Sequence, residues 1–143
     1  VYGKIFNDMI YVSCAIIIHQ NRILICQRSE SMSLPLKWEF PGGKVELNES
    51  PANCIIREIQ EELNLEIEVH KQLTTIFYSY PDFSLSLIPF ICTTTNSNYV
   101  LKEHKDANWC CIEEIENLDL AEADIPIIDE LRSLWNSEFM KLL

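Results

Sequence analysis

The alternation of apolar and polar residues predicts strands on both sides of one long helix. Residues 11–18 and 22–27 are rich in β-branched and apolar side chains, and a short polar turn at residues 19–21 separates them. This arrangement is typical of a β-hairpin. Residues 65–70 alternate strictly and predict a half-buried strand that runs on toward Tyr80, and residues 83–92 predict the next strand.

The clearest local signal is a helix between Ser50 and Asn64. Ser50 is a favourable N-cap, and Pro51 suits the first helical position because its missing N–H is not needed there. Asn64 suits a left-handed residue at the end of the helix. The apolar side chains between these ends recur at helical spacing and predict one buried stripe: Ala52, Ile55, Ile56, Ile59 and Leu63.

Shorter elements complete the pattern. We expect short strands at residues 44–46 and 109–112, and one helical turn at residues 113–118. Asp124 can cap a last helix, whose apolar stripe lies within residues 127–135. Two main helices with a mixed β-sheet predict an α/β (α+β) sandwich.

Composition bounds the molecule to a single domain of residues 1–143. Residues 1–8 show no periodicity and are interpreted as a disordered or non-native extension. No segment approaches the 18 uninterrupted apolar residues of a membrane span. The net charge of −11 argues against a nucleic-acid polymer as partner, since such a surface should be basic. The oligomeric state stays open between monomer and homodimer.

The six cysteines form no C-x-x-C pair, and most lie among apolar strand or helix residues. We interpret them as buried free thiols, which indicates a reducing, cytoplasmic location. The three histidines do not cluster along the sequence, so a zinc site is not indicated.

Three glutamates, Glu58, Glu61 and Glu62, share the helix flank that faces away from the apolar stripe. Like charges at this spacing repel one another. Two interpretations are open: a solvated acidic face, or a site where a divalent cation supplies the missing positive charge. Gly42 and Gly43 shortly precede the helix, and glycines allow backbone to approach a ligand closely.

Fixed spacing favours the metal interpretation. Gly43, then Glu49, then the run 57–65 (Arg-Glu-Ile-Gln-Glu-Glu-Leu-Asn-Leu) resembles the Nudix box. The one departure is Asn64, which stands where the family has Gly and tolerates the same left-handed conformation. The resemblance covers roughly residues 11–135 and implies a Nudix-type α/β/α sandwich with a mixed β-sheet.

The resemblance also implies a metal-dependent hydrolase that uses Mg²⁺, with Mn²⁺ as a substitute. Glu58 or a nearby carboxylate would activate the attacking water, with Glu61 beside it. Arg57 would orient Glu58 and Glu49 by salt bridges, which leaves Glu49 a structural role. The implied metal ligands are the carbonyl of Gly42 and the carboxylates of Glu58, Glu61 and Glu62.

Outside the box, residues 38–46 are similar to the run that leads into the box in the MutT-type branch. That branch places one more metal-binding or base carboxylate in a later loop, where this chain has Glu103; the alternative is an ordinary loop glutamate. Lys44 would touch phosphate or, alternatively, be a solvated strand lysine.

Residues 123–126 (Ala-Asp-Ile-Pro) match the segment with which the branch reads the base. The best-known MutT proteins have Asn where this chain has Asp124. An ionised Asp only accepts hydrogen bonds, so it suits the amino group of cytosine or must be protonated to meet a carbonyl. The alternative role of Asp124 is a plain helix N-cap.

Three further side chains are candidates for substrate contact. Phe40 and Tyr80 would stack on a base, although aromatic residues on strands also serve as core. Arg28 would meet phosphate or a base edge, or be a surface arginine.

The resemblance implies a cytoplasmic nucleotide-pool enzyme that hydrolyses a nucleoside triphosphate to the monophosphate and pyrophosphate. Oxidised nucleotides such as 8-oxo-dGTP come first as substrates, and CTP, dCTP or modified cytosine nucleotides are the alternative. A third reading is a nucleotide-sensing domain without catalysis. Such a domain should lack a metal carboxylate, and Glu58, Glu61 and Glu62 are all present.

Overall fold

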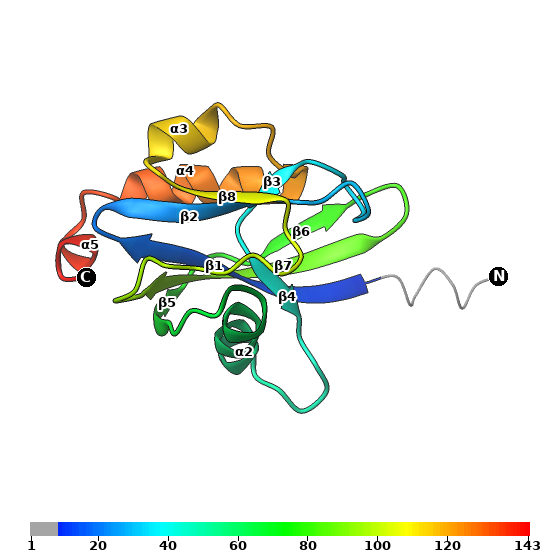
Figure 1. The fold of residues 1–143 in the computed structure, drawn as a ribbon, viewed down its shortest axis with the longest axis horizontal. Helices are drawn as coiled ribbons and strands as arrows, with labels where there is room; N and C mark the ends of the chain where they lie inside the picture. Colours follow the sequence, from blue (N-terminus) through cyan, green and yellow to red (C-terminus); the bar gives the residue numbers. More distant parts are fainter. Residues whose placement is uncertain (1–8) are drawn as a thin grey trace.

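The computed structural model describes residues 9–143 and shows a mixed sheet between two layers of helices (Figure 1). Helix α2 covers one face of the sheet, and α3 and α4 cover the other. This is the predicted α/β/α sandwich. The strands are β1 (Met9–His19), β2 (Arg22–Gln27), β3 (Trp38–Glu39), β4 (Gly42–Lys44), β5 (Glu68–Gln72), β6 (Ile76–Ser79), β7 (Ser84–Thr93) and β8 (Asp106–Cys110). The helices are α2 (Pro51–Leu63), α3 (Ile112–Glu116), the 3₁₀ turn η1 (Glu122–Asp124), α4 (Ile125–Leu134) and α5 (Glu138–Lys141).

The long central strand β1 organises the sheet. The main strand order is β3-β2-β1-β7-β5, while β4 pairs with β1, β6 with β7 and β8 with β2. β1 and β7 run parallel, from Met9 beside Ser84 to Ile18 beside Thr93, and the other described pairs are antiparallel. The predicted hairpin of β1 and β2 is confirmed.

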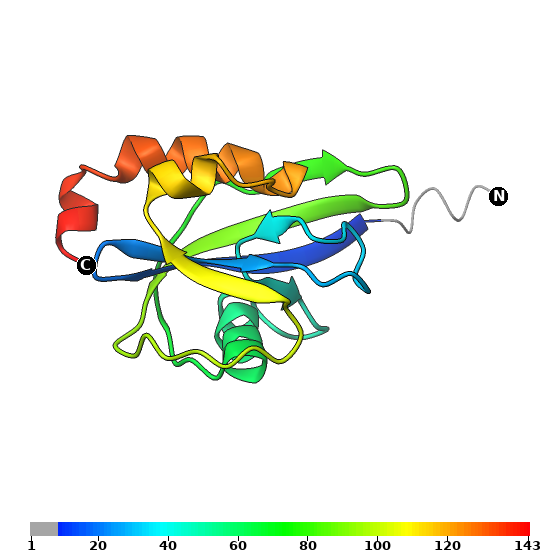
Figure 2. The same ribbon diagram turned by 45° about the horizontal axis from the view of Figure 1, so that its top comes forward.

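Burial on both faces explains the continuous apolar run in β1. Ile16 and Ile18 pack into the core under α4, whereas Ala15 and Ile17 pack into the core under α2. Figure 2 shows helices on both sides of the sheet. Each fully buried Ile contributes about 1.5–3 kcal/mol relative to exposure. The strand therefore joins the two halves of the molecule.

Helix α2 begins and ends as the sequence predicts. The Ser50 hydroxyl accepts a hydrogen bond from Asn53 N–H at 3.1 Å, and Asn64 takes the left-handed conformation with φ 54°. The buried stripe differs from the prediction at Ile56, which is 41% exposed. Cys54 is buried in the helix instead. The rest of the stripe packs on the sheet, so the acidic flank is left outside.

Three predicted strand boundaries are wrong. The strand expected at residues 44–46 starts two residues earlier, because β4 pairs its glycines with β1. The strand expected from residue 65 begins at Glu68, and the core holds Leu65. The strand expected at 109–112 is β8 (Asp106–Cys110), which starts three residues earlier because these residues pair through their backbone with β2. Helix α5 was not expected from the sequence.

Other expectations have mixed outcomes. The thiols are free as predicted; five are buried, and Cys111 is partly exposed. Within residues 9–143, no helix has the length and apolar character needed to cross a membrane. The expected extension at residues 1–8 lies outside the described residues.

Candidate active site

The two glycines of β4 bring the backbone against both the sheet and α2. A Cβ atom on Gly42 would lie 1.9 Å from the carbonyl oxygen of Ser13 on β1. A Cβ atom on Gly43 would lie 2.2 Å from Cδ of Glu58. Neither position can hold a larger residue without displacing its neighbour, so the glycines set the Glu58 carboxylate directly against the strand.

Arg57 holds three of the box glutamates. Its Nε donates to Glu49 at 2.6 Å, and its Nη1 donates to Glu58 at 2.9 Å and to Glu61 at 3.1 Å. The hydrogen bond from Arg57 lowers the pKa of Glu49 to about 2. The side chains of Glu49 and Glu58 are largely covered, at 15% and 14% exposed, whereas Glu61 is 58% exposed. The predicted orienting contacts of Arg57 are present.

Glu62 lies on the same flank, but its pKa is shifted in the direction opposite to that of Glu49. Burial, as the largest cause, and the nearby charges of Glu58, Glu103 and Glu39 together raise its pKa to about 8. The box helix, the β3 strand and the 100–105 loop therefore bring carboxylates together around Glu62. In the metal-free protein this raised pKa favours a protonated Glu62 at neutral pH.

The chemistry of this donor set fits a hard divalent cation, which prefers carboxylate and carbonyl oxygens. The carboxylates around Glu62 repel its negative charge, and this repulsion adds to the effect of burial in raising the pKa of Glu62. A cation in its place would relieve the same repulsion. Among residues 9–143, no three His, Cys, Asp or Glu side chains stand in a ligand arrangement. Arg57 binds both Glu58 and Glu61 in this structure.

A pocket of about 350 Å³ opens beside the glycine strand. Gly42 and Gly43 line it, and Leu34, Phe83 and Leu85 contribute apolar surface. The pocket also brings together the five side chains that the sequence analysis assigned to substrate: Arg28, Phe40, Lys44, Tyr80 and Asp124.

Asp124 is the buried polar group of this pocket. It stands at the start of α4, yet its side chain makes no capping hydrogen bond. Instead Oδ2 accepts from the backbone N–H of Phe40 at 2.8 Å, so the N-cap alternative is wrong for the side chain. Within the described residues Oδ1 has no hydrogen-bond partner. Every fully buried side-chain oxygen among these residues does have a partner, so Oδ1 cannot be fully buried. Oδ1 is therefore open to the pocket.

Burial sets the protonation of Asp124. It raises the pKa of this carboxyl well above its ordinary value, and the charge of Glu39 acts in the same direction. A protonated Asp124 can donate a hydrogen bond as well as accept one.

Tyr80 and Phe40 form walls of the pocket. The Tyr80 hydroxyl accepts from Ala123 N–H at 2.9 Å, which fixes the ring beside the segment that carries Asp124. Tyr80 also packs against the ring of Phe83, with ring centroids 5.1 Å apart. Both Tyr80 and Phe40 are buried, so each serves the core and lines the pocket.

Sequence reasoning missed two residues at this site. Glu39 accepts from Arg28 Nη1 at 2.9 Å and 3.1 Å and from His104 Nε2 at 3.0 Å. Arg28 is therefore not the surface arginine that the sequence left as an alternative, since only 19% of its side chain is exposed. A charged residue between two aromatic ones in a short strand was the available signal for Glu39. His104 had none, because its partner is 65 residues away along the chain.

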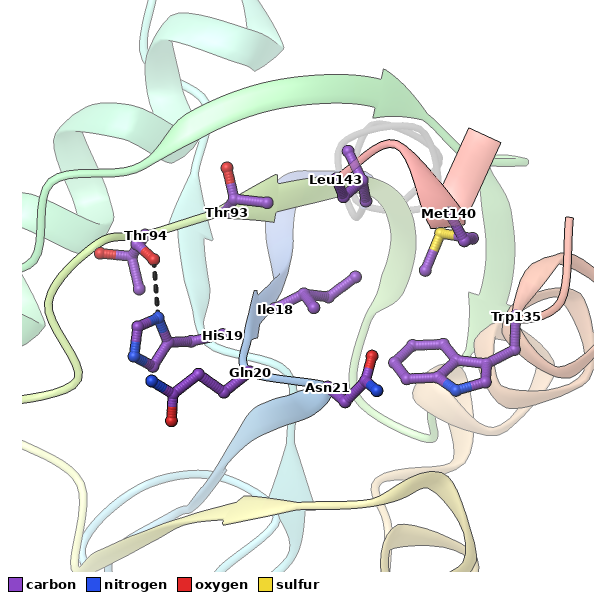
Figure 3. Close-up of a pocket in the computed structure, with 9 residues that line it drawn as sticks. All are labelled: Ile18, His19, Gln20, Asn21, Thr93, Thr94, Trp135, Met140 and Leu143. Atoms are coloured by element: carbon purple, nitrogen blue, oxygen red, sulfur yellow. Dashed lines mark hydrogen bonds between the residues drawn. The ribbon is translucent and has the colours of Figure 1, made fainter. Parts of the chain in front are cut away.

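A second pocket, of about 530 Å³, lies at the turn between β1 and β2, near α5 (Figure 3). His19, whose ring is hydrogen-bonded to the Thr94 carbonyl, lines it together with Trp135 and Met140. It is the larger cavity, but no Asp, Glu, Lys or Arg side chain lines it. It therefore lacks the charges that a metal–phosphate site needs, and the smaller pocket beside β4 is the better candidate.

Comparison with known proteins gives consistent results. The family model "NUDIX domain" matches residues 9–131. A CTP pyrophosphohydrolase from Escherichia coli (strain K12) is 32% identical over 88% of this chain and 93% of its own length. An 8-oxo-dGTP diphosphatase from the same strain is 28% identical over 80% of this chain and 88% of its own length. The solution structure of the DNA mismatch repair protein MutT (Nudix hydrolase family) from methicillin-resistant Staphylococcus aureus 252 is 40% identical, with a TM-score of 0.70 over 94% of this chain and 98% of that one.

Proposed function

This chain belongs to the Nudix family, and from that premise we propose that it is a Mg²⁺-dependent nucleoside triphosphate pyrophosphohydrolase. It would convert a ribo- or deoxyribonucleoside triphosphate to the monophosphate and pyrophosphate. Oxidised nucleotides such as 8-oxo-dGTP are the first candidate substrates. The relatives named as diphosphatase and pyrophosphohydrolase support the reaction class.

One observation carries the proposal: the acidic flank of α2 and the base pocket meet at the same two glycines. Gly43 lies against Glu58, and both glycines line the pocket that ends at Asp124. A nucleotide with its base in the pocket would extend its phosphates past the glycines toward the carboxylates.

The residues that would hold Mg²⁺ are the Gly42 carbonyl and the carboxylates of Glu58, Glu61, Glu62 and Glu103. When bound, Mg²⁺ draws charge from phosphate oxygens and lowers the pKa of water. Glu58 would accept the proton of the attacking water. Arg57 keeps one oxygen of Glu58 engaged at 2.9 Å and so fixes the direction of the other. Lys44 is exposed at the end of β4 and would meet the phosphates.

Asp124 bears on the choice of base. The N–H of Phe40 engages Oδ2 as an acceptor, so Oδ1 would be the atom that meets the base. Burial favours the protonated carboxyl, which would donate to the carbonyl of an oxidised purine. In this state Asp124 offers the same donor as the Asn of the best-known MutT proteins.

Cytosine nucleotides are the second candidate. An ionised Asp124 would accept from the exocyclic amino group of cytosine. The E. coli CTP pyrophosphohydrolase is among the relatives of this chain, at 32% identity.

A panel of common and oxidised triphosphates, assayed with Mg²⁺ for pyrophosphate and monophosphate, tests the proposal. We expect turnover with pyrophosphate as product and the highest kcat/KM for 8-oxo-dGTP. A preference for dCTP would select the second candidate. Binding of nucleotide without any turnover would instead identify a sensing domain and refute the proposed activity.

A further inference from the structure

Glu39 joins three segments that are far apart in the sequence. Its carboxylate accepts from Arg28, at the end of β2, and from His104, in the loop before β8. Arg28 in turn donates to the Ser33 carbonyl at 2.6 Å, in the loop that lines the base pocket. Since a carboxylate accepts and does not donate, Nε2 of His104 carries the proton of this contact.

The loop that contains His104 also carries Glu103. The loop is tied at its start, where Val100 N–H donates to the Leu63 carbonyl at the end of α2, at 2.9 Å. It is tied at its end by Lys105 N–H, which donates to the Gln27 carbonyl at 2.9 Å. Between these ties His104 is the buried anchor, with 4% of its side chain exposed, whereas Glu103 is exposed.

His104 and the neighbouring Glu103 differ in their surroundings. His104 is buried and bound to Glu39, whereas Glu103 is exposed and close enough to Glu62 for its charge to raise the pKa of that carboxyl. Three hydrogen bonds from two nitrogens, Arg28 Nη1 and His104 Nε2, engage both carboxylate oxygens of Glu39. Glu39 is therefore suited to hold protein groups in place, and Glu103 is the member of the pair that faces the acidic cluster.

We propose that His104 and Glu39 are positioning residues, whose hydrogen bond holds the 100–105 loop so that Glu103 completes the metal-binding carboxylates. This inference rests on the proposed function, because it assigns a support to that same site. It also links the two ends of the site, since Arg28 connects Glu39 to the loop over the base pocket. The support acts through Glu103. Glu39 also lines the base pocket, whereas His104 does not, so His104 is the member of the pair that acts through Glu103 alone.

Removal of the donor should weaken metal binding and leave the fold intact. His104→Phe keeps a ring of similar volume and removes the N–H donor. Loss of a residue that orients a ligand typically costs about 10- to 100-fold in metal affinity or activity. His104→Gln restores a side-chain N–H donor and should recover most of the affinity. Glu39→Gln removes one acceptor and should behave like His104→Phe.

The matched control is His70→Phe. His70 on β5 is also hydrogen-bonded within the sheet, with Nε2 2.7 Å from Thr93 Oγ1, and within the described residues its side chain has no hydrogen bond to a site residue. It should bind metal as the wild type does.

The experiment titrates each metal-free protein with Mn²⁺ and follows free Mn²⁺ by electron paramagnetic resonance, with kcat and KM measured in parallel. We expect about 10- to 100-fold weaker Mn²⁺ binding for His104→Phe, recovery for His104→Gln and no change for His70→Phe. A lower kcat at saturating substrate and near-normal KM in excess metal should accompany the loss. If His104→Phe does not fold, Glu39→Gln carries the test.

Two results would overturn the inference: Mn²⁺ binding within twofold of wild type in a folded His104→Phe or Glu39→Gln, or no recovery in His104→Gln. Either result, in a wild-type enzyme that hydrolyses triphosphates, would leave the proposed function standing. A wild type that binds Mn²⁺ normally but turns over no triphosphate would refute the proposed function and leave the positioning role intact.

Discussion

Glu58 occupies the position at which a small chemical change should have the largest effect. Its carboxylate lies against Gly43 and is bound by Arg57, so it is held in place on two sides. Glu58→Gln keeps the shape and an oxygen for the Arg57 contact but removes the basic oxygen. We expect turnover to fall by about 10²- to 10⁴-fold with the melting temperature nearly unchanged.

Steady-state pyrophosphate release measures this effect, and circular dichroism checks the fold. Glu66→Gln is the matched control, since Glu66 is exposed just beyond the same helix. Near-normal turnover in Glu58→Gln would remove Glu58 from the mechanism.

Asp124 should decide the base, and Asn separates the two candidates. The Phe40 N–H must still find an acceptor, so the oxygen of the introduced amide would take that contact. The amide nitrogen would then face the pocket as a donor. We expect Asp124→Asn to keep 8-oxo-dGTP hydrolysis and to lose dCTP hydrolysis by about 10-fold or more, since each good contact to a base edge is worth about 1–3 kcal/mol.

The ratio of kcat/KM for the two nucleotides is the measurement. Equal losses for both would mean that Asp124 supports the pocket without reading the base.

At the scale of elements, helix α2 was predictable because its signals are local. The cap at Ser50, the proline after it and the left-handed Asn64 each act within a few residues of chain. The exposure of Ile56 was not predictable, because the sequence of the helix does not reveal how much of its apolar stripe the sheet will cover. The width of the contact is a property of the packed molecule.

The Ser50 cap offers a test of this local contribution. Ser50→Ala removes the acceptor for Asn53 N–H, which should lower the free energy of unfolding by about 1 kcal/mol. Urea denaturation measures the change. Ser137 caps α5 in the same way but that helix buries no residue, so Ser137→Ala should leave global unfolding nearly unchanged. Equal effects of the two substitutions would contradict this account.

The part of the site that depends on residue spacing within one segment was predictable. The part that depends on contacts between distant segments was not. The box residues lie within one helix and its preceding turn, so their fixed spacing identified them. The contacts of Glu39 with Arg28 and His104 come from three segments, and Asp124 finds its partner 84 residues away along the chain. Strand β4 likewise begins at Gly42, where the close backbone of β1 leaves no space for a side chain. The alternation of apolar and polar residues had suggested a later start. Such pairings depend on tertiary packing, which no local pattern records.

At the scale of the whole molecule, the chain folds with a net charge of −11 and concentrates acidic groups on one flank. The consequence is a pH-dependent stability in the absence of metal. The pKa of Glu62 is about 8 in the folded protein and 4.5 ordinarily, so over this range the folded state holds a proton that the unfolded state releases. Stability must therefore fall as pH rises through that window.

Asp124 adds a fall of the same sign, because burial also raises its pKa, whereas Glu49 acts only at lower pH, below 4.5. Thermal unfolding in a chelator at pH 5 to 8 should show a decline in melting temperature for the wild type and a flatter one for Glu62→Gln. Mg²⁺ should stabilise the wild type more at pH 8 than at pH 5, since it competes with the proton. Parallel curves for the two proteins would mean that Glu62 ionises normally and that the carboxylates on this flank do not need a cation.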